Sequence, residues 1–221
     1  MASSREREQE IYRGNSRLAT RASTRAAVLR LFTDWGFVVR AARFALGLPV
    51  PMQTEDRRVL EQIIFPYFDS DTETRTVLFV GCDWYTKHYQ RVFFRSHTFW
   101  TIDPAPRAAR FGGRQHIIAP LESLEEHFPP AHFDLILCNG VYGFGLDTQD
   151  QCERAFEACH SRLRAQGCLV LGWDDIPERT PVPLAGIAAL QRFQRWSFPP
   201  LGTWRYLTDT AYRHTYDFYR R

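Results

Sequence analysis

The distribution of apolar residues changes at Thr76, where the chain begins to alternate between two patterns. Short runs of consecutive apolar residues alternate from there with segments in which apolar residues recur at helical spacing. The runs, which we predict to be strands, are 77–80, 98–102, 116–119, 133–138 and 168–172, and the clearest helical segments are 86–94 and 149–164. Strands that are apolar at nearly every position are typical of parallel sheets covered on both faces. The pattern predicts an α/β fold with a mostly parallel sheet and helices on both faces.

The end of the chain departs from this alternation. Residues 204–207 and 214–219 are both strand-like, and only about six residues separate them, too few for a crossover helix. We therefore predict that they pair antiparallel. The segment 176–203, rich in proline and aromatic residues, precedes this pair and is predicted to be an inserted substrate lid.

The residues before the first strand divide into two parts. Residues 1–22 are polar and arginine-rich, which predicts a flexible arm, and residues 23–72 predict an N-terminal helical cap on a domain formed by 73–221. Within the cap, one helix carries an apolar stripe from Val28 to Leu46, and a second is predicted from Thr54 to about Pro66. The basic residues of the first helix also fit weak contact with a membrane surface, although packing on its own domain is the more usual role of such a helix.

Composition narrows the functional classes. The chain has 221 residues, 44% of them hydrophobic and 24% charged, which suits one globular domain and excludes global disorder. A formal net charge of +3 is too small to indicate a nucleic-acid partner. The five cysteines are odd in number and lack metal-ligand spacing, so we predict a reducing environment and no metal site. With no apolar segment long enough for a signal or a membrane span, the sequence predicts a cytoplasmic protein.

The residues that follow each predicted strand are the candidates for chemistry, because open α/β sheets bind ligands beyond the carboxyl ends of their strands. Asp103 ends the second strand, about twenty residues after the turn at Gly81. An acid in this position accepts hydrogen bonds from the hydroxyl groups of a ribose. The alternative is an ordinary turn aspartate, which is common before a residue such as Pro104.

The first loop indicates which nucleotide fits. A dinucleotide site needs three glycines so that backbone N–H groups can approach a pyrophosphate. Here Gly81 is present, but Asp83 and Tyr85 stand where further glycines are needed, and the Asp83 carboxylate repels a phosphate. S-adenosylmethionine has no phosphate and carries cationic sulfonium and ammonium groups, so the loop favours it over a dinucleotide.

From Thr76 to the end, the chain resembles the class I S-adenosylmethionine-dependent methyltransferases, of the seven-stranded type 11/12-like group, with a degenerate glycine loop. The resemblance lies in the order and spacing of the glycine loop 77–83, the acid motif 102–106, Glu122-Ser123, the fourth-strand motif 138–141 and the segment 163–171. It implies a Rossmann-like, mostly parallel seven-stranded sheet with an antiparallel last strand. It also implies S-adenosyl-L-methionine as cofactor, bound by Gly81, Cys82, Asp83, Tyr85, Asp103, Pro104, Glu122, Ser123, Asn139 and Gly140.

The predicted activity is methyl transfer to a small-molecule acceptor or to one bound to a carrier or glycan. His88 and Asp174 are the candidate catalytic residues, with a solvent-facing helix histidine as the alternative for His88. Asp174 and Asp175 also fit a cap on the turn before Pro177, or a pair that holds a divalent cation. His214 is predicted to be structural.

Two other functions compete with methyl transfer. They are a methyltransferase-like fold that catalyses other chemistry, and a non-catalytic relative that binds a partner. Methylation of nucleic acid is disfavoured, because residues 139–142 lack the Asn/Asp-Pro-Pro-Tyr/Phe motif of that group.

Overall fold

The computed structural model describes residues 54–221 and five earlier positions, Val39, Ala42, Arg43, Leu46 and Leu48. Backbone contacts divide the chain into the units Met1–Val50 and Pro51–Arg221. The predicted flexible arm, 1–22, lies outside the described residues, as does most of the first predicted helix. All that follows concerns the second unit.

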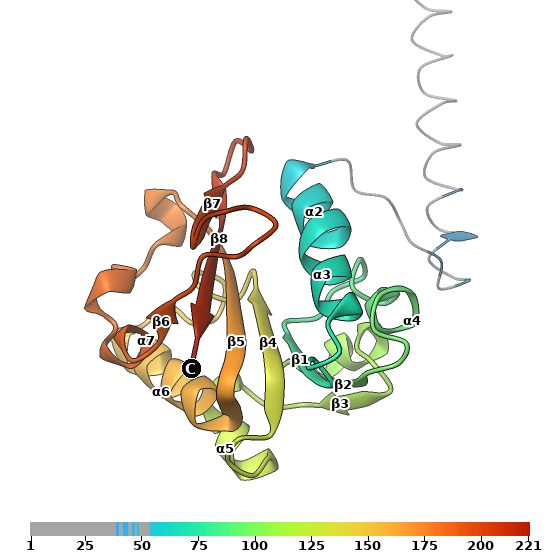
Figure 1. Ribbon diagram of the computed structural model, residues 1–221, viewed down its shortest axis with the longest axis horizontal. Coiled ribbons are helices and arrows are strands. Elements are labelled where there is room, and N and C mark those ends of the chain that lie inside the picture. The colour runs from blue at the N-terminus through green and yellow to red at the C-terminus, as the bar shows by residue number, and fades with distance from the viewer. Residues whose placement is uncertain (1–38, 40–41, 44–45, 47, 49–53) are drawn as a thin grey trace, which may run out of the picture. The chain divides into compact units, whose positions relative to one another are not determined.

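The second unit is built on one mixed sheet (Figure 1). The strands β1 to β5 are Thr76–Val80, Thr98–Ile102, Gln115–Ile117, Phe133–Asn139 and Leu163–Asp174, and they run parallel in the order β3-β2-β1-β4-β5. The last strand, β8 (His214–Arg220), lies antiparallel beside β5. The short strands β6 (Gln194–Arg195) and β7 (Arg205–Leu207) pair with different parts of β8, so eight strands fill seven positions. The predicted fold class and the antiparallel terminal pair are confirmed.

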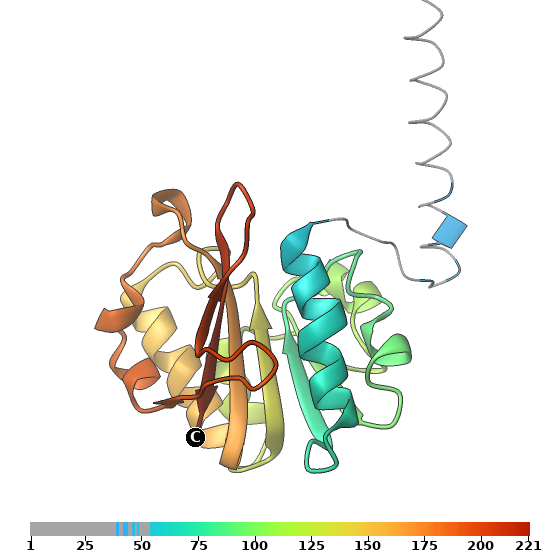
Figure 2. The same ribbon diagram turned by 45° about the horizontal axis from the view of Figure 1, so that its top comes forward.

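Helices cover both faces of this sheet (Figures 1 and 2). On one face lie α6 (Gln149–Arg162), the 3₁₀ turn η3 (Leu121–Ser123) and α5 (Leu124–His127), which form a core with alternate residues of β1, β4 and β5. Thr148 begins α6 with a capping box, in which its hydroxyl accepts from the backbone of Gln151 and the Gln151 side chain accepts in return. On the other face lie α2 (Glu55–Val59), η1 (Leu60–Ile64), α3 (Phe65–Ser70) and α4 (Tyr89–Val92).

The segments α2, η1 and α3 are one continuous helix, and the predicted end near Pro66 was wrong. Pro66 has no N–H, and in a regular α-helix its ring would clash with the carbonyl four residues earlier. The helix avoids this by widening to a π-helix at 60–64, where the Phe65 N–H bonds to the Leu60 carbonyl. Residues assigned from sequence to a cap, including Val59 and Phe68, are buried against the sheet in the same unit.

Three further segments differ from the sequence-based expectations. The predicted helix 86–94 is reduced to α4, and the predicted strand 116–119 is shifted to Gln115–Ile117. The helix predicted to reach Arg164 ends at Arg162, because the buried side chain of Leu163 pairs with Phe133 and begins β5 instead. The segment 176–203 forms the 3₁₀ turns η4 (Pro177–Arg179) and η5 (Leu184–Gly186), α7 (Ala188–Gln191) and β6. Within the described part of the chain, no helix combines the length and apolar character that crossing a membrane requires.

Candidate functional site

Two adjoining cavities open at the carboxyl ends of the parallel strands. Cavity A, about 410 Å³, is lined mostly by apolar groups from the ends of β1 and β2 and from the loops after β3 and β4. Cavity B, about 390 Å³, is more polar and also receives residues from α2, β5 and β8. Gly81, Asp103, Gly140 and Phe144 line both cavities. A larger cavity of about 520 Å³ lies at the opposite ends of β4 and β5, away from the edge where such sheets bind ligands.

The turn after β1 is closed by Asp103 from the neighbouring strand. Oδ2 of Asp103 accepts from the Cys82 N–H at 2.8 Å, and Oδ1 accepts from the Ala105 N–H at 2.8 Å. Asp103 thus makes the turn contact expected of an aspartate before proline, and it also fixes the first loop to the second strand. A carboxylate has about four acceptor positions, so each oxygen retains one for a ligand.

Glycines keep the space above this turn open. Gly81 has φ +82°, and a Cβ on it would lie 2.9 Å from Cγ2 of Val141. Gly140, after β4, has φ +69°, and a Cβ there would meet nothing within 4 Å. Both positions therefore need glycine for their backbone conformation, and the space above Gly140 belongs to both cavities.

Side-chain bonds hold the rest of the loop in place of the two missing glycines. The Asp83 N–H donates to Oγ1 of Thr86, and that hydroxyl donates back to the Asp83 carbonyl at 2.8 Å. Burial, together with the nearby Asp103 carboxylate, raises the pKa of the Cys82 thiol to about 12, which keeps the thiol protonated at neutral pH. The degenerate loop is therefore ordered by its own polar residues.

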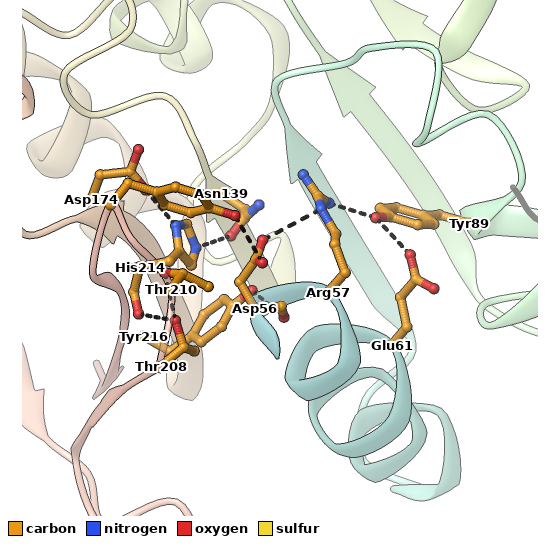
Figure 3. Close-up of polar contacts among 11 residues, drawn as sticks. Asp56, Arg57, Glu61, Tyr89, Asn139, Asp174, Thr208, Thr210, His214 and Tyr216 are labelled. Atoms are coloured by element: carbon orange, nitrogen blue, oxygen red, sulfur yellow. Dashed lines mark hydrogen bonds and ion pairs between the residues drawn. The ribbon is translucent and has the colours of Figure 1, made fainter. Parts of the chain in front are cut away.

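A buried polar network from α2 forms one wall of cavity B (Figure 3). Nη1 of Arg57 donates to the Tyr89 hydroxyl at 2.7 Å, and that hydroxyl donates to Glu61 at 3.2 Å. The Arg57 guanidinium lies 4.0 Å above the ring of Tyr85, and its Nε is 3.7 Å from Oδ2 of Asp56. Among the residues that the structure describes, Arg57 is the only arginine or lysine that lines cavity B.

Two neighbouring strands bring a second polar group to the same cavity (Figure 3). Nδ1 of His214, at the start of β8, lies 2.7 Å from Oδ1 of Asp174, at the end of β5. Nε2 of His214 lies 3.2 Å from Oδ1 of Asn139, at the end of β4. Asp174 and Asp175 do not act as a pair, because Asp175 bonds to Arg213 at 3.2 Å and does not line cavity B.

The structure brings most of the predicted site residues together. Of the ten predicted cofactor residues, Gly81, Cys82, Asp83, Tyr85, Asp103, Pro104, Glu122, Asn139 and Gly140 line one or both cavities. Ser123 lines neither, and its hydroxyl donates to the Pro120 carbonyl. Asp174 lines cavity B, whereas the predicted lid, 176–203, lines neither cavity and packs partly against α6.

His88, the other predicted catalytic residue, lies in the core. It is 3% exposed, its ring packs edge-on against Tyr89, and it lines neither cavity. Because α4 begins only at Tyr89, the His88 side chain is directed inward and not along an exposed helix face. Burial, with Arg91 and Arg57, lowers the pKa of His88 to about 4.

This lowered pKa predicts an acid-sensitive contribution to stability. Between about pH 6.5 and pH 4 the unfolded chain protonates this histidine and the folded chain does not, so stability falls as the pH falls. We expect His88→Gln to remove roughly 1–2 kcal/mol of the loss between pH 7.5 and pH 5, measured by urea unfolding. His127→Gln, at an exposed position of α5, is the matched control. An unchanged pH dependence in His88→Gln would contradict this assignment.

Sequence reasoning missed the contribution of α2 and of the loop before β8. Asp56 and Arg57 line cavity B although they precede Gly81 by more than twenty residues. Tyr212 also lines it, and its hydroxyl donates to Oδ1 of Asp56 at 3.0 Å. The only feature of the sequence that could have indicated a site here is the acidic first turn of the helix. Such a turn is equally typical of an ordinary helix start.

Comparisons with known proteins agree with this geometry. No protein-family model matches the chain, and no curated protein matches it. Among solved structures, it is similar to the N-methyltransferase NodS from Bradyrhizobium japonicum WM9, with a TM-score of 0.54, 18% identity, and coverage of 76% of this chain and 96% of that one. NodS in complex with S-adenosyl-L-homocysteine gives a TM-score of 0.55 at 18% identity, covering 76% of this chain and 87% of that one. A TehB-like methyltransferase from Corynebacterium glutamicum gives 0.53 at 16% identity, covering 83% and 95%.

The chain has the class I S-adenosylmethionine-dependent methyltransferase fold. At these identities the likeness establishes the fold alone. In this methyltransferase fold, cavities A and B lie at the carboxyl edge of the sheet, around the glycine turn after β1 and the acid that ends β2.

Proposed function

We propose that this protein binds S-adenosyl-L-methionine across cavities A and B and transfers its methyl group to a small-molecule or carrier-bound acceptor. The observation that carries the proposal is the position of Asp103. Its carboxylate lies where the apolar and the polar cavity meet, as a ligand with a nucleoside at one end and charged groups at the other requires. Each cavity also falls in the size range of about 300–1,000 Å³ that is typical of small-molecule sites.

The chemistry of the two cavities fits the two halves of this ligand. The apolar walls of cavity A, which include Ile102 and Leu121, suit an adenine ring, with Glu122 at their edge. Asp103 suits the two ribose hydroxyls. In cavity B, Arg57 suits the carboxylate of the methionine part, and Asp83 suits its ammonium group.

Residues of the chain account for binding and orientation, which are the main requirements of a methyl transfer. The donor supplies an activated methyl group on a sulfonium. Asp103 and Arg57, which both line cavity B, would hold the donor at two points and so restrict where its methyl group faces. Asn139, Asp174 and His214 line the same cavity and would face the acceptor.

Thermal unfolding with and without ligand tests the proposal. S-adenosyl-L-homocysteine at about 100 times its dissociation constant stabilises a folded state by roughly 2.7 kcal/mol, which raises the melting temperature of a chain of this size by about 5–10 °C. NAD⁺ is the matched control, because it has the same adenosine and a pyrophosphate that the Asp83 loop repels. Equal shifts with both ligands, or no shift with S-adenosyl-L-homocysteine at millimolar concentration, would refute the proposal.

A further inference from the structure

Cavity B combines carboxylates with aromatic rings. Asp56 and Asp174 are 5% and 8% exposed, and both line the cavity. The rings of Tyr85, Phe144 and Tyr212 line it as well, and the first two already carry a cation on one face, the guanidinium groups of Arg57 and Arg179. Carboxylates and aromatic faces are the two groups that recognise organic cations in proteins. The pattern therefore points to a positively charged partner.

The balance of charge supports the same conclusion. Among the residues that the structure describes, four carboxylates line cavity B, those of Asp56, Asp83, Asp103 and Asp174, against the single guanidinium of Arg57. Arg57, Asp83 and Asp103 are the groups that the proposed function assigns to the donor, which leaves the carboxylates of Asp56 and Asp174 to face the acceptor. An acceptor with a carboxylate or phosphate would enter a cavity of its own charge sign, whereas an ammonium ion would be attracted.

A histidine is held within the same cavity by a carboxylate. When Nδ1–H of His214 donates to Asp174, the neutral ring has its lone pair on Nε2, 3.2 Å from Oδ1 of Asn139, and a proton gained at Nε2 would be donated to that oxygen. Gly172 makes this arrangement possible, because a Cβ on it would lie 1.9 Å from Oδ1 of Asn139 and 3.0 Å from Nε2 of His214. Three adjacent strands thus place a proton acceptor at the wall of cavity B.

We propose that the methyl acceptor is a primary or secondary amine, which enters cavity B as an ammonium ion attracted by Asp56 and Asp174 and gives up a proton to His214. This rests on the proposed function. The ammonium must first lose a proton, which Nε2 of His214 accepts while Asp174 stabilises the resulting imidazolium. The nitrogen lone pair then forms the bond to the methyl carbon, and the sulfur–methyl bond breaks with its electron pair passing to sulfur. The imidazolium afterwards releases its proton to solvent. His214 is thus a catalytic residue, and Asp174 is one as well, because it binds the ammonium while it holds the His214 ring.

The test uses three probes of similar shape and different charge, benzylamine, benzyl alcohol and benzoate, at pH 7.5. Each is titrated to millimolar concentration into the full-length protein saturated with S-adenosyl-L-homocysteine, and the ring signals of histidine are followed by NMR. His214→Gln identifies its own signals by their loss. We expect benzylamine to shift the His214 signals and to bind at least about tenfold more tightly than benzyl alcohol, and we expect benzoate to leave the signals unchanged.

Asp174→Asn has a matched control in the next residue. Asp174→Asn keeps the size of the side chain and removes the charge beside His214. The affinity for benzylamine should therefore fall at least about tenfold, while the affinity for benzyl alcohol stays the same. Asp175→Asn removes the same charge one residue away, where the carboxylate contacts Arg213 outside cavity B, and should leave both affinities unchanged. Asp56→Asn is the second variant should Asp174→Asn fail to fold, and it should also weaken benzylamine selectively.

The outcomes separate the acceptor class from the proposed function. Saturable binding of S-adenosyl-L-homocysteine together with selective binding of benzylamine supports the amine acceptor. Saturable binding of S-adenosyl-L-homocysteine with benzoate binding as tightly as benzylamine, or with no response of His214 to benzylamine, overturns the amine acceptor and leaves the proposed function standing. Failure to bind S-adenosyl-L-homocysteine refutes both.

Discussion

Asp103→Ala is expected to abolish the stabilisation by S-adenosyl-L-homocysteine. On the proposed function, the substitution removes the acceptor for two ribose hydroxyls. It also frees the backbone N–H groups of Cys82 and Ala105, which Asp103 binds at 2.8 Å. A hydrogen bond to a charged group contributes about 1.5–3 kcal/mol, so losing two such bonds to the ligand lowers affinity by roughly a hundredfold or more. The first loop loses its anchor at the same time, which lowers the melting temperature of the free protein as well.

Calorimetric titration of S-adenosyl-L-homocysteine measures this effect directly. Asp150→Ala is the control, because Asp150 is exposed on α6 and pairs with Arg154, away from both cavities. Asp103→Asn tests the charge itself, since its amide has one acceptor oxygen where the carboxylate has two. If Asp103→Ala binds the ligand as tightly as the unchanged protein, Asp103 does not hold the ribose and the central contact of the proposed function is lost.

The sheet could be predicted from sequence because of how it is buried. Its central strands are covered on both faces, and a doubly covered strand is apolar at consecutive positions, as in residues 77–80 and 133–138. The antiparallel pairing of β7 and β8 followed from the short connection between them. Both predictions depend on local sequence alone, and both are confirmed.

The part of the candidate site that lies on the sheet could also be predicted from local sequence. Gly81 and Asp103 each follow a strand, Asn139 is the last residue of β4, and strand ends of a parallel sheet meet at one edge. Arg57 could not be found in this way. Its presence in cavity B depends on how α2, which lies far from the glycine loop in the sequence, packs in the folded chain.

His88 is the opposite case to Arg57: the sequence indicated it as a site residue, and it lines neither cavity. Its position soon after the glycine loop made it a catalytic candidate, on the assumption that a helix began at Thr86 and left the ring accessible. The chain instead forms turns up to Tyr89, and the ring is enclosed by Tyr89 and Phe93. Helix boundaries are the least certain part of sequence-based reasoning, and a shift of three residues is enough to turn a side chain from solvent into the core.

Arg57→Met is expected to separate recognition of the amino-acid part of the ligand from recognition of the nucleoside. If the guanidinium pairs with the ligand carboxylate, S-adenosyl-L-homocysteine should bind about 10–100-fold more weakly to the variant. 5′-Methylthioadenosine has the same nucleoside and no amino acid, so its affinity should stay the same. Stability should fall as well, by about 3–5 kcal/mol, because the buried carboxylate of Asp56 loses its charged partner.

Arg58→Met provides the matched control for this prediction. Arg58 is the next residue of the same helix, its side chain is 53% exposed, and it contacts Glu55 at 3.6 Å. Its replacement changes the net charge equally and should leave both affinities and the stability nearly unchanged. Should Arg57→Met not fold, Tyr89→Phe removes only the hydroxyl that orients the guanidinium and should weaken S-adenosyl-L-homocysteine by a smaller factor. Equal losses for S-adenosyl-L-homocysteine and 5′-methylthioadenosine in either variant would show that Arg57 shapes the cavity and does not bind the carboxylate.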